Sequence, residues 1–452
     1  MQVFSIPVEG RFILYRPLLQ LAFVGNQAMA DLVLRLANQA DDSSASLSVG
    51  VPEAALSFLQ TIGFLSPDPP APPNLAYHTT MAVLLLTNRC DLRCTYCYAN
   101  GGAEPAQDLP LELARVAIDT VCRNALELGQ PRFELCFHGG GEPVQAWTTL
   151  REATAYARSK SIPCDISLVT NGVWTARQRE WILQNLNGVS ISFDGGQATQ
   201  DRQRPFVSGQ SSFKAVMHTI TALDQAGFPY GIRMTATTPW REQLPQDVRF
   251  ICQETGCRAM QVEPAFNTRR GEHQGPTDAE AQAFAQAFME AFEIARQVGR
   301  QLTYSGARPW LLTRAFCTAP YGALIVNAAG DWVACYEVAS SRHPLAKMST
   351  VGHILGDQVV IDTPSRDALI AYLEAKRDRC QDCFCYWHCA GDCYTRSFFA
   401  QAAPSRAGER SPRCTMNREI AAHILLWYIM AGDGVWRGQG AAPQEARLLR
   451  SF

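Results

Sequence analysis

Residues 87–98 read Thr-Asn-Arg-Cys-Asp-Leu-Arg-Cys-Thr-Tyr-Cys-Tyr, and an apolar run at residues 83–86 comes directly before them. The run is typical of a buried strand, so we expect three cysteines on the loop that follows it. Structural zinc sites prefer four ligands in paired C-x-x-C knuckles. Three thiols on one loop instead suit a metal cluster with one metal open to an outside ligand. Chance cysteines, or a zinc site that lacks one member, are the alternatives.

Short apolar segments alternate with longer amphipathic segments through the middle of the chain. We expect strands near residues 83–86, 133–137, 166–169, 189–193, 230–236 and 259–262. We expect helices near residues 110–128, 146–160, 176–186, 211–226, 244–255 and 278–298. This alternation is typical of a parallel α/β architecture, and six units are too few for a closed eight-fold barrel. The prediction is an open, partial (β/α)6 barrel with ligands at the carboxyl ends of its strands.

Polar residues follow the later strands in order. Gly139-Gly140-Gly141-Glu142-Pro143 follows the second strand, Thr170-Asn171-Gly172 ends the third, and Ser192-Phe193-Asp194-Gly195 ends the fourth. With the cysteine loop, these residues make the stretch 81–305 resemble the radical S-adenosylmethionine (SAM) superfamily. The resemblance implies that Cys90, Cys94 and Cys97 are catalytic and bind a 4Fe–4S cluster.

The same resemblance implies which residues contact SAM. They are Tyr96, Gly140, Gly141, Glu142, Thr170, Asn171, Ser192, Asp194 and Arg204. Glycine suits the turn because backbone carbonyls must approach the ligand without an intervening Cβ. Arg204 corresponds to the arginine that pairs with the SAM carboxylate, a geometry that a guanidinium fits well, although Arg202 lies close by.

The chain contains 16 cysteines. At 452 residues it is too long for its cysteines to form the disulfide framework of a small secreted domain. The N-terminus lacks the pattern of a secretory signal, so we expect a cytoplasmic protein with reduced thiols. Eight cysteines follow the barrel. Seven of them have a spacing that resembles the SPASM domain, here a separate, loop-rich iron–sulfur domain over residues 306–420: Cys317, Cys335, Cys380, Cys383, Cys389, Cys393 and Cys414.

The SPASM resemblance implies two auxiliary 4Fe–4S clusters. An outer thiol group would comprise Cys380, Cys383, Cys389 and Cys414, and an inner thiol group Cys317, Cys335 and Cys393. One iron of the inner cluster then has no matching cysteine, and a substrate group, water or Cys385 could occupy that position. A zinc-binding domain and disulfides are the alternatives. The other five cysteines, which are Cys122, Cys136, Cys164, Cys252 and Cys257, are expected to be small buried hydrophobic residues.

The residues after Cys335 depart from one branch of the family. Sulfatase-maturing relatives carry an aspartate directly after the corresponding cysteine, where this chain has Tyr336 and then Glu337. Sulfatase maturation is therefore disfavoured. Tyr336 or Glu337 could serve in proton transfer, but ordinary packing or a solvated charge explains both residues equally well.

The chain ends are expected to form smaller units. Residues 1–66 combine strands at 11–15 and 21–24 with two amphipathic segments, the first capped by Asn26, and resemble a small winged-helix-like precursor-recognition domain. A structural N-terminal cap is the alternative. A Pro-rich linker follows at 67–80, and residues 421–452 are expected to hold a C-terminal helix and tail.

Composition excludes other classes. A formal net charge of -2 and the lack of a basic run argue against nucleic acid, and no apolar stretch reaches the ~20 residues of a membrane span. The resemblance implies an enzyme that abstracts hydrogen from a ribosomally made precursor peptide and forms a carbon–carbon or thioether cross-link. A flavodoxin or ferredoxin would donate electrons. Backbone excision, epimerisation, oxidation of a protein residue or small molecule, and an iron–sulfur electron carrier are the alternatives.

Overall fold

A computed structural model of the chain describes residues 1–39, 52–237, 240–266, 270–272, 274–400 and 411–438. Its centre is an open sheet in the order β10-β9-β8-β7-β6-β5-β4-β11-β12-β13-β14. All neighbouring strands from β10 to β11 pair in parallel. The six predicted strands are confirmed as β4 (Met81–Leu85), β5 (Phe133–His138), β6 (Cys164–Thr170), β7 (Gly188–Ser192), β8 (Tyr230–Ala236) and β9 (Ala259–Pro264).

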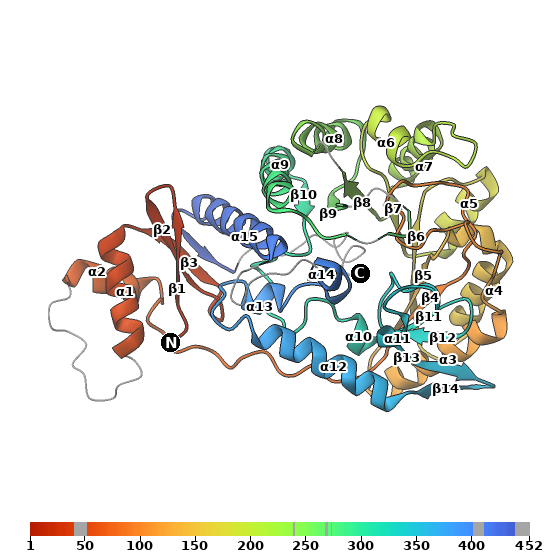
Figure 1. Cartoon of the computed structure of the whole chain (residues 1–452), viewed down its shortest axis with the longest axis horizontal. Coiled ribbons are helices and arrows are strands. Elements are labelled where there is room, and N and C mark those ends of the chain that lie inside the picture. Colours follow the sequence, from red (N-terminus) through yellow and green to blue (C-terminus); the bar gives the residue numbers. More distant parts are fainter. Residues whose placement is uncertain (40–51, 238–239, 267–269, 273, 401–410, 439–452) are drawn as a thin grey trace.

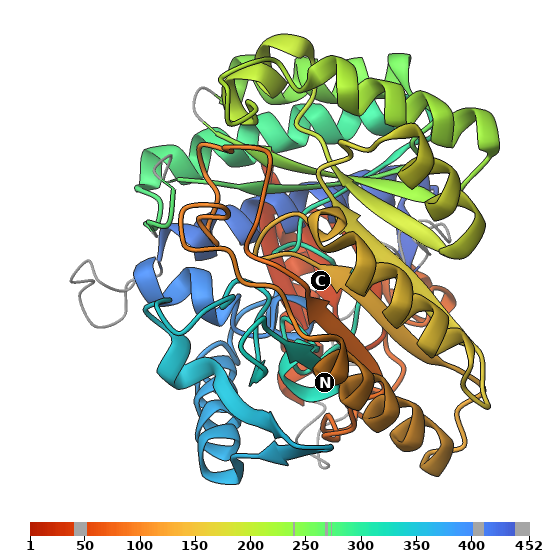
Figure 2. The same ribbon diagram turned by 90° about the vertical axis from the view of Figure 1, so that its right-hand side faces the viewer.

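Helices connect these strands and cover the outside of the curved sheet (Figures 1 and 2). They are α3 (Leu111–Glu127), α4 (Trp147–Arg158), α5 (Ala176–Asn185), α7 (Phe213–Ala226), α8 (Trp240–Glu254) and α9 (Asp278–Gln297), all close to their predicted bounds. The sequence does not predict η1 (Pro143–Ala146) or α6 (Gln197–Gln203). The residues of α6 are mostly polar and give no apolar period to read.

The cysteine-rich segment begins as a continuation of the sheet, where the sequence predicts a separate loop-rich domain. β10 (Gln301–Thr303) closes one edge, and β11 (Ala323–Val326) pairs in parallel with β4 at the other side. β12 (Asp331–Val333), β13 (Thr350–Leu355) and β14 (Gln358–Ile361) then extend the sheet antiparallel. The four apolar residues of β11 are buried, and such a short run is easily missed among cysteines.

The other helices of this segment precede, separate or follow these strands. They are α10 (Ala319–Gly322), α11 (Ala346–Ser349), α12 (Thr363–Asp378), α13 (Tyr386–Cys389), α14 (Tyr394–Ala400) and α15 (Pro412–Ala431). The last helix starts nine residues before residue 421, where the sequence predicts the C-terminal helix and tail to begin, because Ser411 caps it and Pro412 opens it. Within the described residues, no helix combines the length and the apolar character that a bilayer crossing requires.

The N-terminal unit has a sheet of its own. β1 (Phe4–Val8), β2 (Arg11–Arg16) and β3 (Leu21–Gly25) pair antiparallel, followed by α1 (Gln27–Gln39) and α2 (Glu53–Thr61). Asn26 caps α1 as predicted, accepting the Met29 N–H at 2.9 Å. The sequence does not predict β15 (Val435–Arg437), which adds a fourth strand beside β3. Buried Trp436 anchors β15 against Tyr15 and Tyr428.

Candidate functional site

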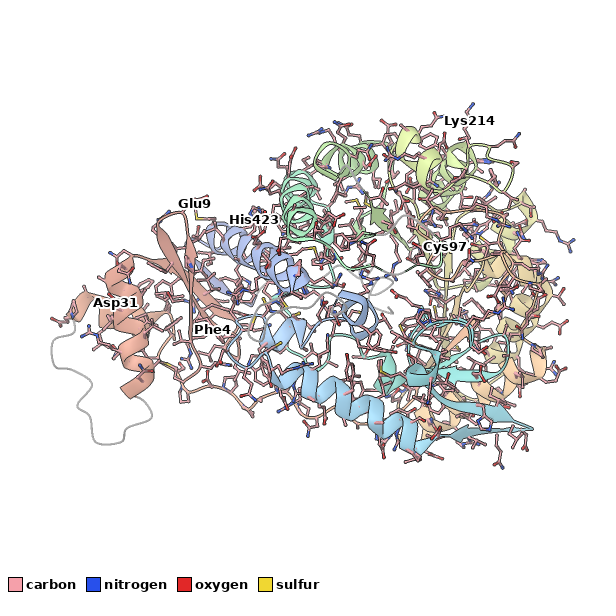
Figure 3. The ribbon with its side chains drawn as sticks, viewed as in Figure 1. Phe4, Glu9, Asp31, Cys97, Lys214 and His423 are labelled. Carbon is pink, nitrogen blue, oxygen red and sulfur yellow. The ribbon has the colours of Figure 1, made fainter. Side chains whose placement is uncertain are left out.

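The cysteine loop leaves the carboxyl end of β4 and lies inside the arc of helices, where Figure 3 labels Cys97. Cys94 is buried, and Cys90 and Cys97 are half-buried. Backbone hydrogen bonds fix the loop. The Thr95 N–H donates to the Gln203 carbonyl at 2.9 Å, and the Gly271 N–H donates to the Cys97 carbonyl at 2.9 Å. The loop is therefore held from two distant parts of the chain.

Two arginines neutralise carbonyl groups of this irregular loop. Arg93 donates to the Cys90 carbonyl at 2.9 Å. Arg270 donates to the Cys94 carbonyl at 2.8 Å and to the Gly101 carbonyl at 2.7 Å. A loop without regular structure needs such partners for its backbone. Sequence reasoning missed Arg270 because it lies far along the chain and outside any motif.

The glycine turn after β5 packs directly on the cysteine loop. The Gly141 N–H donates to the Thr87 carbonyl at 2.8 Å, and the Glu142 N–H donates to the Arg89 carbonyl at 2.7 Å. A Cβ at Gly141 would lie only 2.1 Å from that Arg89 oxygen. The sequence predicts close approach of a ligand at this glycine. In the structure the backbone that approaches it is the cysteine loop, and a Cβ at Gly140 would meet the Ala339 side chain at 2.9 Å.

Three predicted SAM contacts meet one another in a buried network. The Glu142 carboxylate accepts the Thr170 hydroxyl at 2.8 Å and the Asn171 N–H at 2.7 Å. Burial raises the pKa of Glu142 to about 8. The Asn171 amide donates to Asp91 of the cysteine loop at 2.7 Å. This network joins the ends of β5 and β6 to the cysteine loop. These side chains therefore help to position the loop, in addition to any contact with a ligand.

A second network joins Tyr96, Asp194 and Arg204, which the sequence predicts to share one site. The Tyr96 hydroxyl donates to Asp194 at 2.5 Å, and Arg204 Nη1 donates to the Tyr96 oxygen at 2.6 Å. Arg204 also pairs with Asp194 at 3.8 Å. Burial raises the pKa of Asp194, although the Arg204 charge opposes this. Buried Arg204 keeps its Nε without a partner among the described residues, which suits an arginine that waits for a carboxylate ligand.

The remaining predicted contacts separate into two cases. Ser192 ends β7 and is half-buried at the same edge of the sheet. Arg202, the alternative to Arg204, is exposed and donates to the side chain of Gln243 on α8. The structure therefore brings Arg204, and not Arg202, to Tyr96 and Asp194.

Sequence reasoning missed the residues that hold Asp194. Gln203 Nε2 donates to Asp194 Oδ2 at 2.9 Å, and the Thr235 N–H donates to Oδ1 at 2.9 Å. Asp194, Gln203 and Thr235 line a cavity of about 230 Å³ together with Asp247, which accepts the Gly196 N–H at 2.9 Å. Gln203 and Asp247 belong to no recognisable sequence motif, so the sequence gives no signal for either residue.

The structure brings the three predicted inner thiols together, because Cys317, Cys335 and Cys393 line one cavity. The cavity encloses about 520 Å³, part of it open to solvent, and Tyr336 and Asp392 also line it. Burial, and then the neighbouring Cys393, raises the pKa of Cys317 to about 11. Three half-buried thiols around one cavity are a donor set that fits an iron–sulfur cluster.

The outer thiol group comes from the end of α12, the loop after it, α13 and α15. Cys414 lies close enough to raise the pKa of Cys380 and of Cys389, after burial as the main cause. The hydrogen bond from the Cys385 thiol lowers the pKa of Cys383 to about 5. Cys385 therefore belongs with the outer thiols. It does not line the cavity of the inner thiols, which removes it as a candidate for the vacant position there.

All 16 cysteines are free thiols. Of the five unassigned ones, four are buried and Cys252 is half-buried, in agreement with a packing role. Among the described residues, no three Cys, His, Asp or Glu side chains converge closely enough to hold a single metal ion.

Tyr336 and Glu337 lie between the inner thiols and the sheet. The Tyr336 ring stacks on His138 with 5.3 Å between ring centroids. Glu337 accepts Arg396 Nε at 3.2 Å, and Arg396 Nη1 also donates to Glu263 on β9 at 2.5 Å. Glu337 is thus held in an ion-pair network that joins the cysteine-rich segment to the sheet.

Comparison with known families decides the class of this site. Residues 84–249 match the profile of the radical SAM superfamily, and this stretch includes the cysteine loop and both buried networks. This stretch is therefore similar to the radical SAM superfamily. The match indicates an enzyme, and it implies the 4Fe–4S cluster and SAM of that superfamily.

Curated relatives match this chain in part. They include pre-heme d1 synthase of Dinoroseobacter shibae, which is 26% identical over 47% of this chain and 50% of that protein. Fe-coproporphyrin III synthase of Methanosarcina barkeri is 31% identical over 33% and 35%, and GTP 3',8-cyclase of Mycolicibacterium smegmatis is 31% identical over 40% and 54%. The chain spans about half or less of the length of these relatives.

Solved structures share the fold over more of the chain. The AdoMet-bound anSMEcpe covers 78% of this chain and 98% of its own, with a TM-score of 0.60 and 16% identity. Streptococcus suis SuiB bound to precursor peptide SuiA covers 91% and 96%, with a TM-score of 0.51 and 13% identity. At these identities the likeness shows the fold.

Gly141→Ala tests the contact between the glycine turn and the cysteine loop. The new Cβ would displace the Arg89 carbonyl, so we expect a loss of stability of about 1–3 kcal/mol or more, as for other overpacked sites. Urea unfolding of the metal-free protein measures it. Gly322→Ala is the control, because its nearest neighbour would be 3.9 Å away. Equal stability of the two variants would contradict the contact.

Asp247→Asn tests the buried carboxylate beside Asp194. Burial raises the pKa of Asp247 from 3.8 to about 7, so the folded chain binds this proton more tightly than the unfolded chain. The contribution of Asp247 to stability therefore falls as pH rises between these values, by up to about 1.4 kcal/mol per pH unit. Unfolding of the asparagine variant should depend less steeply on pH in this window. Asp165→Asn, at an exposed site, should leave the dependence unchanged, and identical slopes for all three proteins would refute the assignment.

Proposed function

We propose that this chain is a radical SAM/SPASM enzyme that modifies a ribosomally made precursor peptide. The observation that carries the proposal is the position of the loop with Cys90, Cys94 and Cys97 beside the network of Tyr96 and Arg204. A 4Fe–4S cluster on those thiols, when bound, supplies the electron for reductive cleavage of SAM. The networks described above would hold this loop and orient the SAM carboxylate towards Arg204.

The chain's own residues provide the surroundings that radical chemistry needs. Arg204 offers an unpartnered donor to the SAM carboxylate, and Asp194 holds Tyr96 and Arg204 in place. The helices on one side of the sheet and the cysteine-rich segment on the other limit access of water to the strand ends (Figure 1). In this proposal the inner and outer thiol groups bind two auxiliary clusters, and a flavodoxin or ferredoxin supplies electrons.

The share of the chain that matches a peptide-bound structure supports a peptide substrate. SuiB, whose structure is described as bound to a precursor peptide, matches 91% of this chain, which is more than the radical SAM domain alone. We propose a carbon–carbon or thioether cross-link as the product, with excision and epimerisation as alternatives. The names of the curated relatives favour a small molecule such as a tetrapyrrole as the second candidate substrate.

The N-terminal sheet offers an edge for a peptide in this proposal. The chain's own β15 already covers the β3 edge, whereas β1 pairs with β2 alone among the described strands. An extended peptide can add to such a free edge through main-chain hydrogen bonds. The exposed Pro7 lacks an N–H group, so side-chain contacts would have to add to the affinity there.

Cys90, Cys94 and Cys97 are tested together by replacement with Ala. The protein reconstituted anaerobically with iron and sulfide should form 5′-deoxyadenosine from SAM and a strong reductant. The triple variant should form none above the blank, because its loop has no ligands for iron. Cys252→Ala, outside all three groups, should retain full activity. Formation of 5′-deoxyadenosine by the triple variant would refute the proposal, and an electron carrier would form none with the wild-type chain.

The nature of the product is tested by mass. A short peptide encoded beside this chain's gene, co-expressed with it, should lose the mass of two hydrogens if a cross-link forms. A larger loss would show excision instead, and an unchanged mass would contradict cross-linking. Co-expression with the triple cysteine variant is the control and should leave the peptide unmodified.

The β1 edge is tested by photo-crosslinking. A benzophenone amino acid in place of exposed Pro7 should capture the same precursor peptide, because a strand added to β1 passes this position. A benzophenone at Lys214 on α7, on the opposite side of the molecule in Figure 3, should not. Equal capture at both positions would contradict binding at β1.

A further inference from the structure

Helix α15 directs hydrogen-bond donors at the outer thiol group. The Ser411 hydroxyl donates to Cys414 Sγ at 3.4 Å, and the Asn417 amide donates to Cys389 Sγ at 3.4 Å. Arg418 Nη1 donates to Cys383 Sγ at 3.5 Å. Each donor thus reaches a different sulfur of the group.

The orientation of the Asn417 side chain is fixed by a second contact. The buried Tyr304 hydroxyl donates to Asn417 Oδ1 at 2.6 Å. Because a hydroxyl donor selects the oxygen of the amide, the NH2 group of Asn417 is left to point at Cys389. Arg418 is held in a similar way, since its guanidinium lies 4.8 Å from the ring centroid of Phe384.

The cysteine loop of the radical SAM domain is arranged differently. There the guanidinium groups of Arg93 and Arg270 donate to backbone carbonyls, as described above. At the outer group the donors, including the positive charge of Arg418, reach the sulfur atoms themselves. Hydrogen bonds to sulfur and nearby positive charge stabilise the more negative, reduced state of an iron–sulfur cluster.

We propose that Arg418, supported by Asn417 and Ser411, raises the reduction potential of a 4Fe–4S cluster held by the outer thiols. These are positioning residues, because they act through the cysteines. The inference rests on the proposed function, which places a cluster at this group. A cluster at the outer thiols would therefore be easier to reduce than it would be without these donors.

Arg418→Met tests the inference in the reconstituted full-length protein, by redox titration followed with electron paramagnetic resonance. The variant removes the charge and the donor and keeps an unbranched side chain. We expect the midpoint potential of one cluster signal to become more negative, with the iron content unchanged. Arg418→Lys, which keeps the charge, should shift it less. Arg366→Met is the matched control, since Arg366 lies 4.7 Å from the Tyr77 ring centroid and contacts no thiol, and it should shift nothing.

A midpoint potential that is the same in Arg418→Met and in the wild type would overturn the inference while leaving the proposed function intact. Failure of the cluster itself has a different signature. Replacing Cys383 and Cys389 together by Ala should remove roughly four irons per chain, the content of one 4Fe–4S cluster. If the iron content does not fall, no cluster is bound at the outer thiols, and both this inference and the two-cluster part of the proposed function are overturned.

Discussion

The contact between the Arg89 carbonyl and the backbone of Gly141 and Glu142 is the constraint on which the candidate site depends. It brings two turns from neighbouring strands into backbone contact with no room for a side chain between them. The three thiols of the cysteine loop are thereby fixed relative to the carboxyl edge of the sheet. Buried Glu142 strengthens the contact, because its carboxylate reaches across to the end of β6.

Charged side chains are buried at the carboxyl edge of the sheet. Burial removes their hydration, and this loss of free energy must be offset by pairing or by binding a ligand. Asp194 and Arg204 are both buried, and their pairing through Tyr96 compensates for lost hydration. The unpartnered Nε of Arg204 is the part of the network that remains uncompensated. Among the described residues this donor has no partner, so the site is suited to an anionic ligand, in keeping with the radical SAM match over the same stretch.

The sequence predicts the barrel well because each strand is a short apolar run followed by a long amphipathic helix. It does not predict β11 or β15, since four and three residues are too few to show a period. Motif residues such as Tyr96, Asp194 and Arg204 are predicted to meet, and they do. Arg270, Gln203 and Arg396 are not predicted, because their roles depend on tertiary contacts between segments far apart in the chain. The reason for Gly141 is also different from the one the sequence suggests, since the sequence cannot show which backbone approaches it.

The central claim is that Cys90, Cys94 and Cys97 bind a cluster whose open iron is reached by SAM. Its most direct measurement is the electron paramagnetic resonance spectrum of the reduced, reconstituted protein with and without SAM. We expect SAM to shift the signal of one cluster, because a new ligand binds at its open iron. A spectrum that is identical with and without saturating SAM would show that SAM does not bind a cluster at these cysteines.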